Sequence, residues 1–260
     1  MKNFKRILSL FSLSLLPVWI WAQAVVTENT VNASAEPEAH IFATFVKSFD
    51  HNLKLTIEEE IRSAPTHRSH TTVALTYAPL DYLNIFAGYT VKLYGNQGWT
   101  DPNKYIRHRA NVLLTAHTKV GQWSLSLREG VMLDARADEI DTREKNKVDF
   151  TLRSRLQAVY SIPNTPLSIV GKMEMLNALN APTKYLNSVD DNNWSSFYVS
   201  ELRPELGLQW KINKANSLSL TYRYNYIYGR DIRIEDSGDV SVTHKYTPKH
   251  LLLLSYKLDW

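Results

Sequence analysis

Cysteine is absent from the 260 residues, which excludes disulfides, thiol nucleophiles and an amino-terminal lipid-modified cysteine. The basic excess amounts to a formal charge of only +4, and no Lys/Arg-rich run occurs, which argues against a nucleic-acid partner. Glycine is scarce at 9 residues, whereas tyrosine and tryptophan are plentiful at 14 and 7. No Gly-rich phosphate loop, Walker motif or zinc-binding helix is present, and we expect no cofactor and no metal site.

Long hydrophobic runs are also missing, except at the amino terminus. There, three basic residues precede an apolar stretch at 7–21 and the small-residue motif Ala22-Gln23-Ala24. This order predicts a secretory signal peptide at residues 1–24. A membrane anchor helix is the alternative, but the run is short for a span and Pro17 interrupts it. No later stretch approaches 18 consecutive apolar residues, so the sequence predicts no transmembrane helix in the exported chain.

From residue 39 onward, apolar and polar residues alternate with period two, the pattern of strands with two different faces. Eleven stretches show it: 40–49, 53–63, 70–79, 82–93, 105–118, 122–134, 148–161, 166–178, 196–212, 216–229 and 246–260. Most have ten residues or more, whereas soluble strands usually have about 5–6 and a tilted membrane-crossing strand needs about 9–11. The lengths favour a transmembrane β-barrel at 39–260, preceded by a lead-in segment at 25–38 that holds a candidate short first strand.

The connections alternate between short turns, such as 50–52, and long polar loops, such as 135–147. This is the rhythm of short periplasmic turns and long external loops in an outer-membrane barrel. Bacterial single-chain barrels normally have an even number of strands, so eleven stretches leave one strand unaccounted for. Because the last strand must run towards the periplasm, an upward strand should precede 40–49, and residues 25–32 are the candidate. We expect an all-β, antiparallel up-and-down barrel of about 12 strands, with 10 as the alternative.

The carboxyl-terminal stretch LLLLSYKLDW (251–260) carries large apolar residues at every second position and ends on a tryptophan. On a soluble edge strand such a face would be an aggregation hazard, so it needs an apolar covering. A soluble barrel of the lipocalin type is the alternative, with apolar side chains inside, but charges at mid-strand argue against it. A terminal aromatic after this alternation is what the outer-membrane assembly machinery reads. We therefore expect that machinery, outer-membrane lipids and lipopolysaccharide as partners.

If the apolar faces contact lipid, the opposite faces line the lumen, and these faces are rich in charge. The predicted lumen network comprises Glu58, Glu60, Arg62, Arg107, Arg109, Arg128, Arg153, Arg155, Glu174, Glu201, Arg203, Glu205 and Arg223, with Lys172 and Lys257 on the same faces. Unpaired charges are too costly in a dry interior. Two interpretations stay open: a cross-barrel ion-pair network that fills the lumen, which we favour, or a narrow wet channel biased towards anions.

Several stretches together resemble a known family. They include LKLTIEEEIRS (53–63), YIRHRANVLL (105–114), FTLRSRLQAVYSIP (150–163), ELRPELGLQWKINK (201–214) and LSLTYRYNY (218–226), in this order. The chain resembles the bacterial outer-membrane proteins grouped as domain of unknown function 2490, over most of 40–260. The triplet at 107–109 and the acidic run at 58–60 followed by Arg62 are the most specific parts. The resemblance implies an outer-membrane β-barrel of Bacteroidota-like bacteria and supplies no activity, so no catalytic residue is carried over.

Polar residues on the predicted lipid face raise an enzymatic alternative. Glu59, His108 and Glu129 fall on that face, and Ser154 shares it. Hairpin arithmetic places His108, Glu129 and Ser154 at similar heights on three successive strands, as in an outer-membrane lipid hydrolase acting on lipid A or phospholipid. A Ser–His–acid triad requires the histidine to contact both partners, whereas here the strand of the glutamate lies between the other two. We therefore expect no catalytic site.

The external loops offer a third class of function. His67 and His70 lie three residues apart in a loop, a spacing that is a weak metal signal and more typical of solvated histidines. The loop at 179–195 would carry the surface of an adhesin or receptor, although no partner is identifiable. The favoured function is an outer-membrane barrel that is structural or forms a narrow anion-biased channel or binding barrel.

Overall fold

Twelve β-strands and one short helix are present in the part of the chain that the computed structural model describes: residues 29–63, 68–94, 106–138, 140–142, 144–184, 186–189, 193–234 and 240–260. The strands are β1 (Thr30–Asn32), β2 (Glu36–Ser48), β3 (Leu53–Arg62), β4 (Arg68–Leu80), β5 (Leu83–Tyr94), β6 (Ile106–Val120), β7 (Trp123–Arg136), β8 (Val148–Ser161), β9 (Leu167–Ala178), β10 (Tyr198–Lys211), β11 (Asn216–Ile234) and β12 (Val240–Asp259). The helix is α3 (Leu186–Val189). Within the described ranges, no helix has the length and hydrophobicity that crossing a membrane requires. The predicted signal peptide at 1–24 lies outside the described residues.

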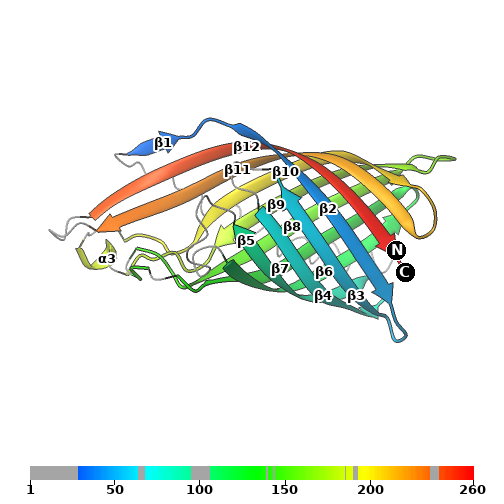
Figure 1. Cartoon of the computed structure of the whole chain (residues 1–260), viewed down its shortest axis with the longest axis horizontal. Coiled ribbons are helices and arrows are strands. Elements are labelled where there is room, and N and C mark those ends of the chain that lie inside the picture. Colours follow the sequence, from blue (N-terminus) through cyan, green and yellow to red (C-terminus); the bar gives the residue numbers. More distant parts are fainter. Residues whose placement is uncertain are drawn as a thin grey trace.

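Strands β2 to β12 form a closed barrel in which each strand is antiparallel to the next (Figure 1). The barrel closes between β2 and β12, whose pairing is parallel and runs from Glu36 opposite Lys249 to Val46 opposite Asp259. Eleven strands joined by hairpins must close this way, because the first and last then run in the same direction. The structure confirms the predicted antiparallel β-barrel and has twelve strands in the described residues, of which eleven close the barrel.

The first strand does not have the direction that the sequence analysis expected. We expected an upward strand at 25–32, but β1 (Thr30–Asn32) pairs in parallel with β12 from Thr30 opposite His244 onward, and so runs in the same direction as β2. The expectation was wrong because β12 bonds directly to β2, which satisfies both edges without an intervening strand. A parallel ladder is slightly less stable per residue than an antiparallel one, but it leaves no open edge.

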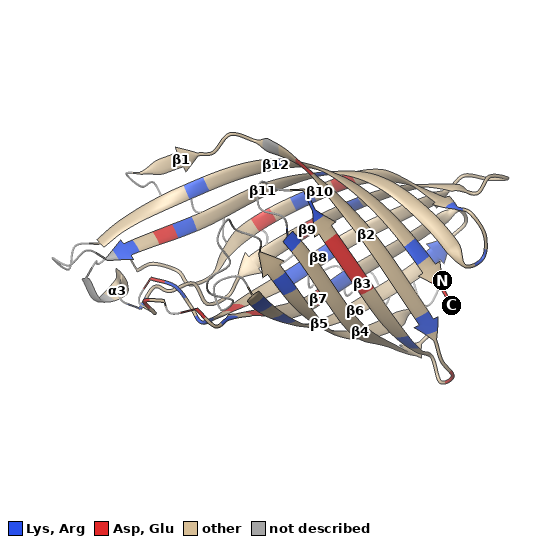
Figure 2. Cartoon of the chain, viewed as in Figure 1, with Lys and Arg blue, Asp and Glu red and all other residues tan. Residues whose placement is uncertain are grey.

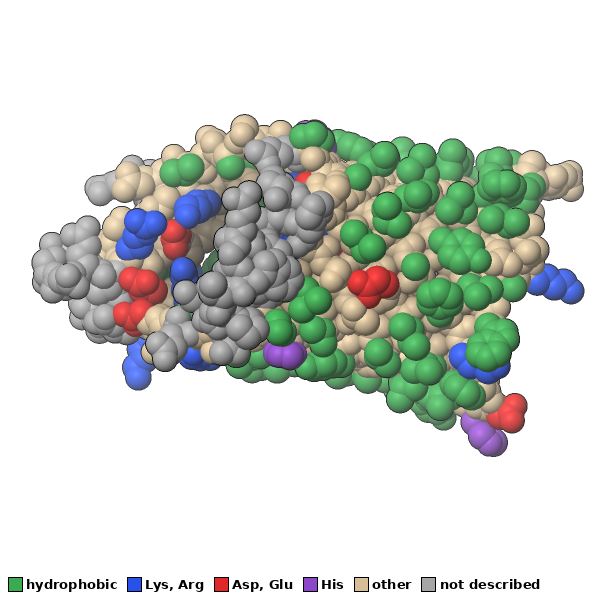
Figure 3. Space-filling view, viewed as in Figure 1, with side chains coloured by type: hydrophobic (Ala, Val, Ile, Leu, Met, Phe, Trp, Pro, Cys, Tyr) green, Lys and Arg blue, Asp and Glu red, His purple; other side chains and the backbone are tan. Residues whose placement is uncertain are grey.

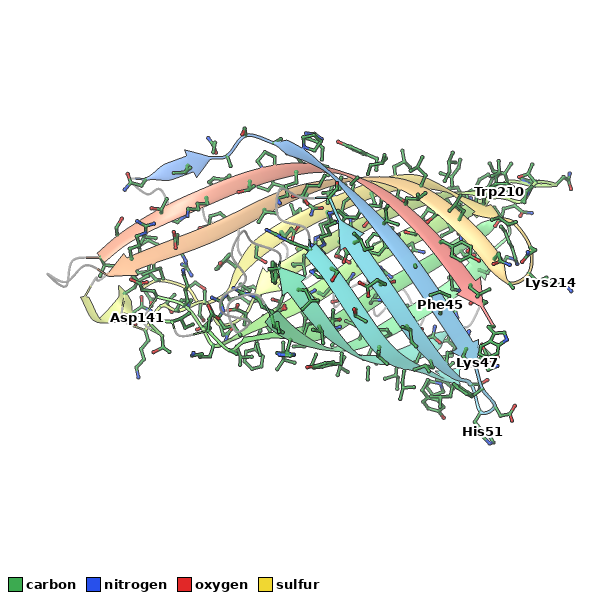
Figure 4. All side chains as sticks on the ribbon, in the orientation of Figure 1. Phe45, Lys47, His51, Asp141, Trp210 and Lys214 are labelled. Atoms are coloured by element: carbon green, nitrogen blue, oxygen red, sulfur yellow. The ribbon has the colours of Figure 1, made fainter. Side chains whose placement is uncertain are left out.

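Short turns lie at one end of the barrel and long loops at the other. His51 and Lys214 mark the turn end, and Asp141 lies at the opposite end (Figure 4). The first turn, residues 50–52 between Phe49 and Leu53, has positive φ at both His51 and Asn52. This arrangement matches the predicted alternation of short and long connections.

Large apolar side chains cover the outside of the barrel, and charged side chains gather towards its two ends (Figure 3). Leu206 is 64% exposed and Val112 55% exposed, values that are unusual for side chains of this size in water. Beside the turn end, the rings of Trp123 and Tyr160 lie 4.9 Å apart, and Trp210 points outwards on a neighbouring hairpin (Figure 4). Outward aromatic residues beside the turns are typical of the aromatic girdle of a membrane β-barrel.

Candidate functional site

The interior of the barrel carries the thirteen charged positions that the sequence analysis assigned to the lumen. Strand registers place each of them on the inward face, opposite an inward neighbour on the next strand. Figure 2 shows the basic and acidic positions recurring along the strands of the barrel. The structure brings nine of these side chains into four ion-paired groups and leaves Glu58, Arg107, Arg128 and Arg155 outside them.

The first group surrounds Glu174 on β9, whose side chain is 2% exposed. Arg153 donates to its Oε2 from Nε and Nη2 at 2.8 and 2.6 Å, and Arg203 donates to its Oε1 at 2.7 Å. Arg203 also binds Glu201 at 2.5 Å. Both oxygens of Glu174 are therefore occupied, which is the condition under which a buried carboxylate is tolerated.

The second group surrounds Glu205 on β10. Lys172 donates to its Oε2 at 2.8 Å, and Arg223 donates to its Oε1 from Nε at 2.6 Å. These residues come from three consecutive strands, β9, β10 and β11, so the ion pairs run across the strands. Pairs of opposite charge across neighbouring strands stabilise the register of a sheet.

The third group surrounds Glu60 on β3. Arg62 donates to Glu60 Oε1 at 2.7 Å, while His40 and His70 lie 3.0 Å from its two carboxylate oxygens. His40 also contacts Glu38 at 3.1 Å. Sequence reasoning missed His40 and expected His70 to be a solvated loop residue, which is wrong. His70 is 6% exposed, because β4 begins at Arg68 and its alternation turns His70 inwards. Its predicted companion His67 lies outside the described residues.

Nearer the loop end, Asp134 on β7 binds Arg109 through a bidentate contact at 2.7 to 3.1 Å and also binds Lys92. Arg107 lies over the ring of Tyr94, with its guanidinium carbon 5.6 Å from the centroid. Sequence reasoning missed Lys92 and Asp134, although the alternation within 84–92 and 123–133 reaches both positions. Farther towards the loop end, Arg136 and Asp149 lie 3.8 Å apart and line the same end of the lumen.

Two cavities lie inside the barrel, one at each end. The cavity of about 460 Å³ near the turns is lined by residues that include His117, Ser126 and Gln157. The cavity of about 370 Å³ near the loops is lined by residues that include Lys92, Asp134 and Arg230. On β7 and β8, the positions between the two cavities are occupied by Arg128, Arg153 and Arg155. We call the layer that separates the cavities the septum, and it consists of Glu58, Arg128, Arg153, Arg155, Lys172, Glu174, Glu201, Arg203, Glu205 and Arg223.

The polar residues of the outer face form pairs rather than a triad. Ser154 donates to Glu129 at 2.7 Å, and the His108 ring binds the Tyr89 hydroxyl at 2.6 Å. His108 lies opposite Ala135, six positions beyond the Leu114–Glu129 pair, which corresponds to roughly 20 Å along the strand. The expectation that His108, Glu129 and Ser154 share a height was therefore wrong. The register of the β6–β7 hairpin pairs His108 with Ala135, so His108 lies nearer the loop end than Glu129. Glu59 has a separate partner, Thr71 at 2.6 Å.

Beyond the barrel, residues 227–234 and 240–248 continue β11 and β12 as a projecting hairpin (Figure 1). Arg230 donates to the Ser195 carbonyl at 2.6 Å, and the Trp194 ring stacks on His244. Tyr228 and His244 Nδ1 lie 2.6 Å apart. Burial raises the pKa of Tyr228 to about 12, and burial together with Arg230 lowers the pKa of His244. A protonated tyrosine thus faces a neutral histidine within the hairpin, and the contacts of Arg230 with Ser195 and of His244 with Trp194 tie the end of the 179–195 loop to it.

Metal-binding chemistry has no site in the described ranges, where no group of three or more His, Cys, Asp or Glu side chains could hold an ion. A family model described as a protein of unknown function (DUF2490) matches residues 39–234. No curated protein matches the chain. A solved structure of the NanC porin is similar with a TM-score of 0.44 and 10% identity, covering 71% of this chain and 78% of the porin chain.

Proposed function

Because this chain belongs to the DUF2490 family of proteins of unknown function, we propose its role from the geometry of its lumen. The proposed role is that of an outer-membrane β-barrel, exported by its signal peptide, whose septum leaves only a narrow, anion-biased path or binding space. The observation that carries the proposal is the septum itself, which separates two cavities and contains more basic than acidic side chains. We propose no catalytic role.

The outer surface supports the membrane part of the proposal. Apolar side chains of this size, exposed over the whole circumference, would aggregate in water but are stable against hydrocarbon. Outer-membrane lipids and lipopolysaccharide are the proposed partners of this surface. The alternate residues Leu252, Leu254, Tyr256 and Trp260 face the same way on β12, and we propose that the assembly machinery recognises them.

The lumen supports the anion bias. A ring of basic side chains favours anions in a pore, and ion pairs across a small barrel fill most of its cross-section. Glu174 lies at the centre of these ion pairs, because Arg153 and Arg203 both bind it. The proposed lumen is therefore too narrow for large solutes to pass.

Conductance in planar lipid bilayers tests the proposal. The full-length protein should show either no steady conductance or small anion-selective steps, because the septum leaves only a narrow path through the lumen. Glu174→Ala, which removes the side chain that holds Arg153 and Arg203, should increase the step size and keep anion selectivity. Asp141→Ala at the loop end serves as the control and should leave the conductance unchanged. Large cation-selective steps from the unmodified protein would refute the proposed lumen.

A further inference from the structure

We propose that Arg128 and Arg155 form a binding site for a small oxyanion, of the carboxylate or phosphate class, within the septum. The site deepens the proposed function and rests on its lumen being open to water and small ions. The two residues are direct partners across β7 and β8, so two guanidinium groups start from adjacent inward positions. Like charges placed directly opposite each other destabilise a sheet unless something compensates them.

The carboxylates around these arginines are already engaged elsewhere. Glu174 lies directly opposite Arg155 on β9, but Arg153 and Arg203 take its two oxygens. Glu205 is likewise shared between Lys172 and Arg223. Two carboxylates, Glu174 and Glu205, therefore lie near Arg155. Among the described residues, neither has an oxygen within ion-pair distance of it.

The hydrogen-bond donors of the two arginines are largely unused. Arg128 donates from Nε to Thr115 at 3.0 Å, a neutral acceptor, and makes no ion pair with a described residue. The Nε of Arg155 is buried and has no hydrogen-bond partner in the described part of the chain. An arginine that is buried without a counter-charge costs several kcal/mol, whereas a guanidinium bound to an oxyanion forms strong paired hydrogen bonds.

The opposite wall does not supply the missing charge. Glu58 on β3 accepts a hydrogen bond from Thr44 at 3.1 Å and interacts with Arg128 and Arg153 only at longer range. The septum thus holds an excess of two positive charges, six basic side chains against four carboxylates, and of these carboxylates only Glu58, at longer range, is left for Arg128 and Arg155. A single divalent oxyanion, or two monovalent ones, would balance it.

A small ion also has a route to the site. Ser126 and Gln157 are paired across β7 and β8, two positions from Arg128 and Arg155, and both line the cavity of about 460 Å³. That cavity is polar at this level, so a hydrated anion can approach the arginines from the turn end. In this proposal the septum binds anions and does not merely block the lumen.

Thermal unfolding of the full-length protein in detergent tests the site, with sodium phosphate and sodium acetate as probes against chloride at equal ionic strength. The unfolding midpoint should rise by roughly 5–10 °C at a hundredfold excess over Kd. Arg155→Met should abolish this rise and should not lower the midpoint in low salt, because it removes an uncompensated charge. Arg109→Met is the matched control, because it breaks an ion pair with Asp134 outside the septum and frees no carboxylate beside Arg155; it should lower the midpoint but keep the rise.

Arg155→Lys keeps the charge but not the planar fork, and should weaken the anion effect without removing the fold. The proposal is overturned if the unmodified protein shows no anion dependence, or if Arg155→Met lowers the midpoint as much as Arg109→Met while the rise persists. Either result leaves the proposed barrel function standing. Large cation-selective currents would refute that function regardless of the melting data.

Discussion

At the scale of the residue, the lumen is organised by carboxylates that each hold more than one cation. Glu174, Glu205 and Asp134 are each contacted by two basic side chains from other strands. Removing one cation leaves the carboxylate partly paired, whereas removing the carboxylate leaves two cations unpaired. The acidic positions are therefore more sensitive to substitution than the basic positions that surround them.

Arg109→Leu illustrates the smaller of these effects. The variant removes the bidentate contact to Asp134, a charged hydrogen-bonded pair worth about 1.5–3 kcal/mol. We expect the temperature at which the folded form is lost in detergent, measured by heat-modifiable gel migration, to fall. Lys214→Leu, at the tip of the β10–β11 turn, should change stability by less than about 0.5 kcal/mol. Equal transition temperatures for the two variants would mean that the lumen is not paired.

At the scale of the element, the parallel ladder between β2 and β12 closes the barrel. Eleven backbone partners are joined along it, from Glu36 to Val46 on β2. Side chains add to the closure, since Lys249 donates to Glu38 at 2.5 Å and the Lys47 ammonium lies 3.8 Å from the ring centre of Trp260. The terminal tryptophan thus anchors the end of the last strand to the first strand of the barrel.

A double-mutant cycle on Glu38→Gln and Lys249→Met measures the strength of this closure. We expect a coupling free energy of about 1–3 kcal/mol, because the pair is charged and Glu38 is shielded from water. The same cycle on Asp231 and Lys245 of the projecting hairpin, whose pair is more exposed, should give less than about 1 kcal/mol. Hydrogen exchange of β2 amides should rise in Glu38→Gln. Unchanged exchange together with a coupling near zero would show that the backbone ladder alone closes the barrel.

At the scale of the whole molecule, the distribution of polarity is inverted relative to a water-soluble barrel. Apolar side chains lie outside and paired charges lie inside, so the surroundings of the protein determine whether it is stable. A substitution on the outer face therefore tests most directly whether water or lipid contacts the barrel wall.

Leu206→Arg tests the outer surroundings. Leu206 is 64% exposed near the middle of β10, so in a bilayer an arginine there should lower the free energy of unfolding by about 2–4 kcal/mol. Ala215→Arg, in the adjacent turn, should have little effect because the turn lies outside the hydrocarbon. Denaturant titration in phospholipid vesicles, followed by tryptophan fluorescence, provides the measurement. Similar stabilities for both variants would mean that water, not lipid, contacts the barrel wall.

Much of this architecture could be predicted from the sequence, because strand side chains alternate with a strict period of two. The same alternation that assigned Leu206 to the outside assigned Arg203 and Glu205 to the inside. The register between strands could not be predicted, because alternation determines which face a residue occupies but not its position along the strand relative to the neighbouring strand. His108 and Glu129 were misplaced for this reason, and His70 because the start of β4 was uncertain by two residues.

The sequence by itself determined the class of barrel, the two faces of each strand and the inward charges, since these depend only on local periodicity and on the different costs of apolar and charged surface. Only the tertiary structure decided the parallel closure of β2 on β12, the direction of β1 and the partner of each carboxylate. These features depend on which strand ends meet and on register. That register is what leaves Arg128 and Arg155 facing each other without a carboxylate of their own.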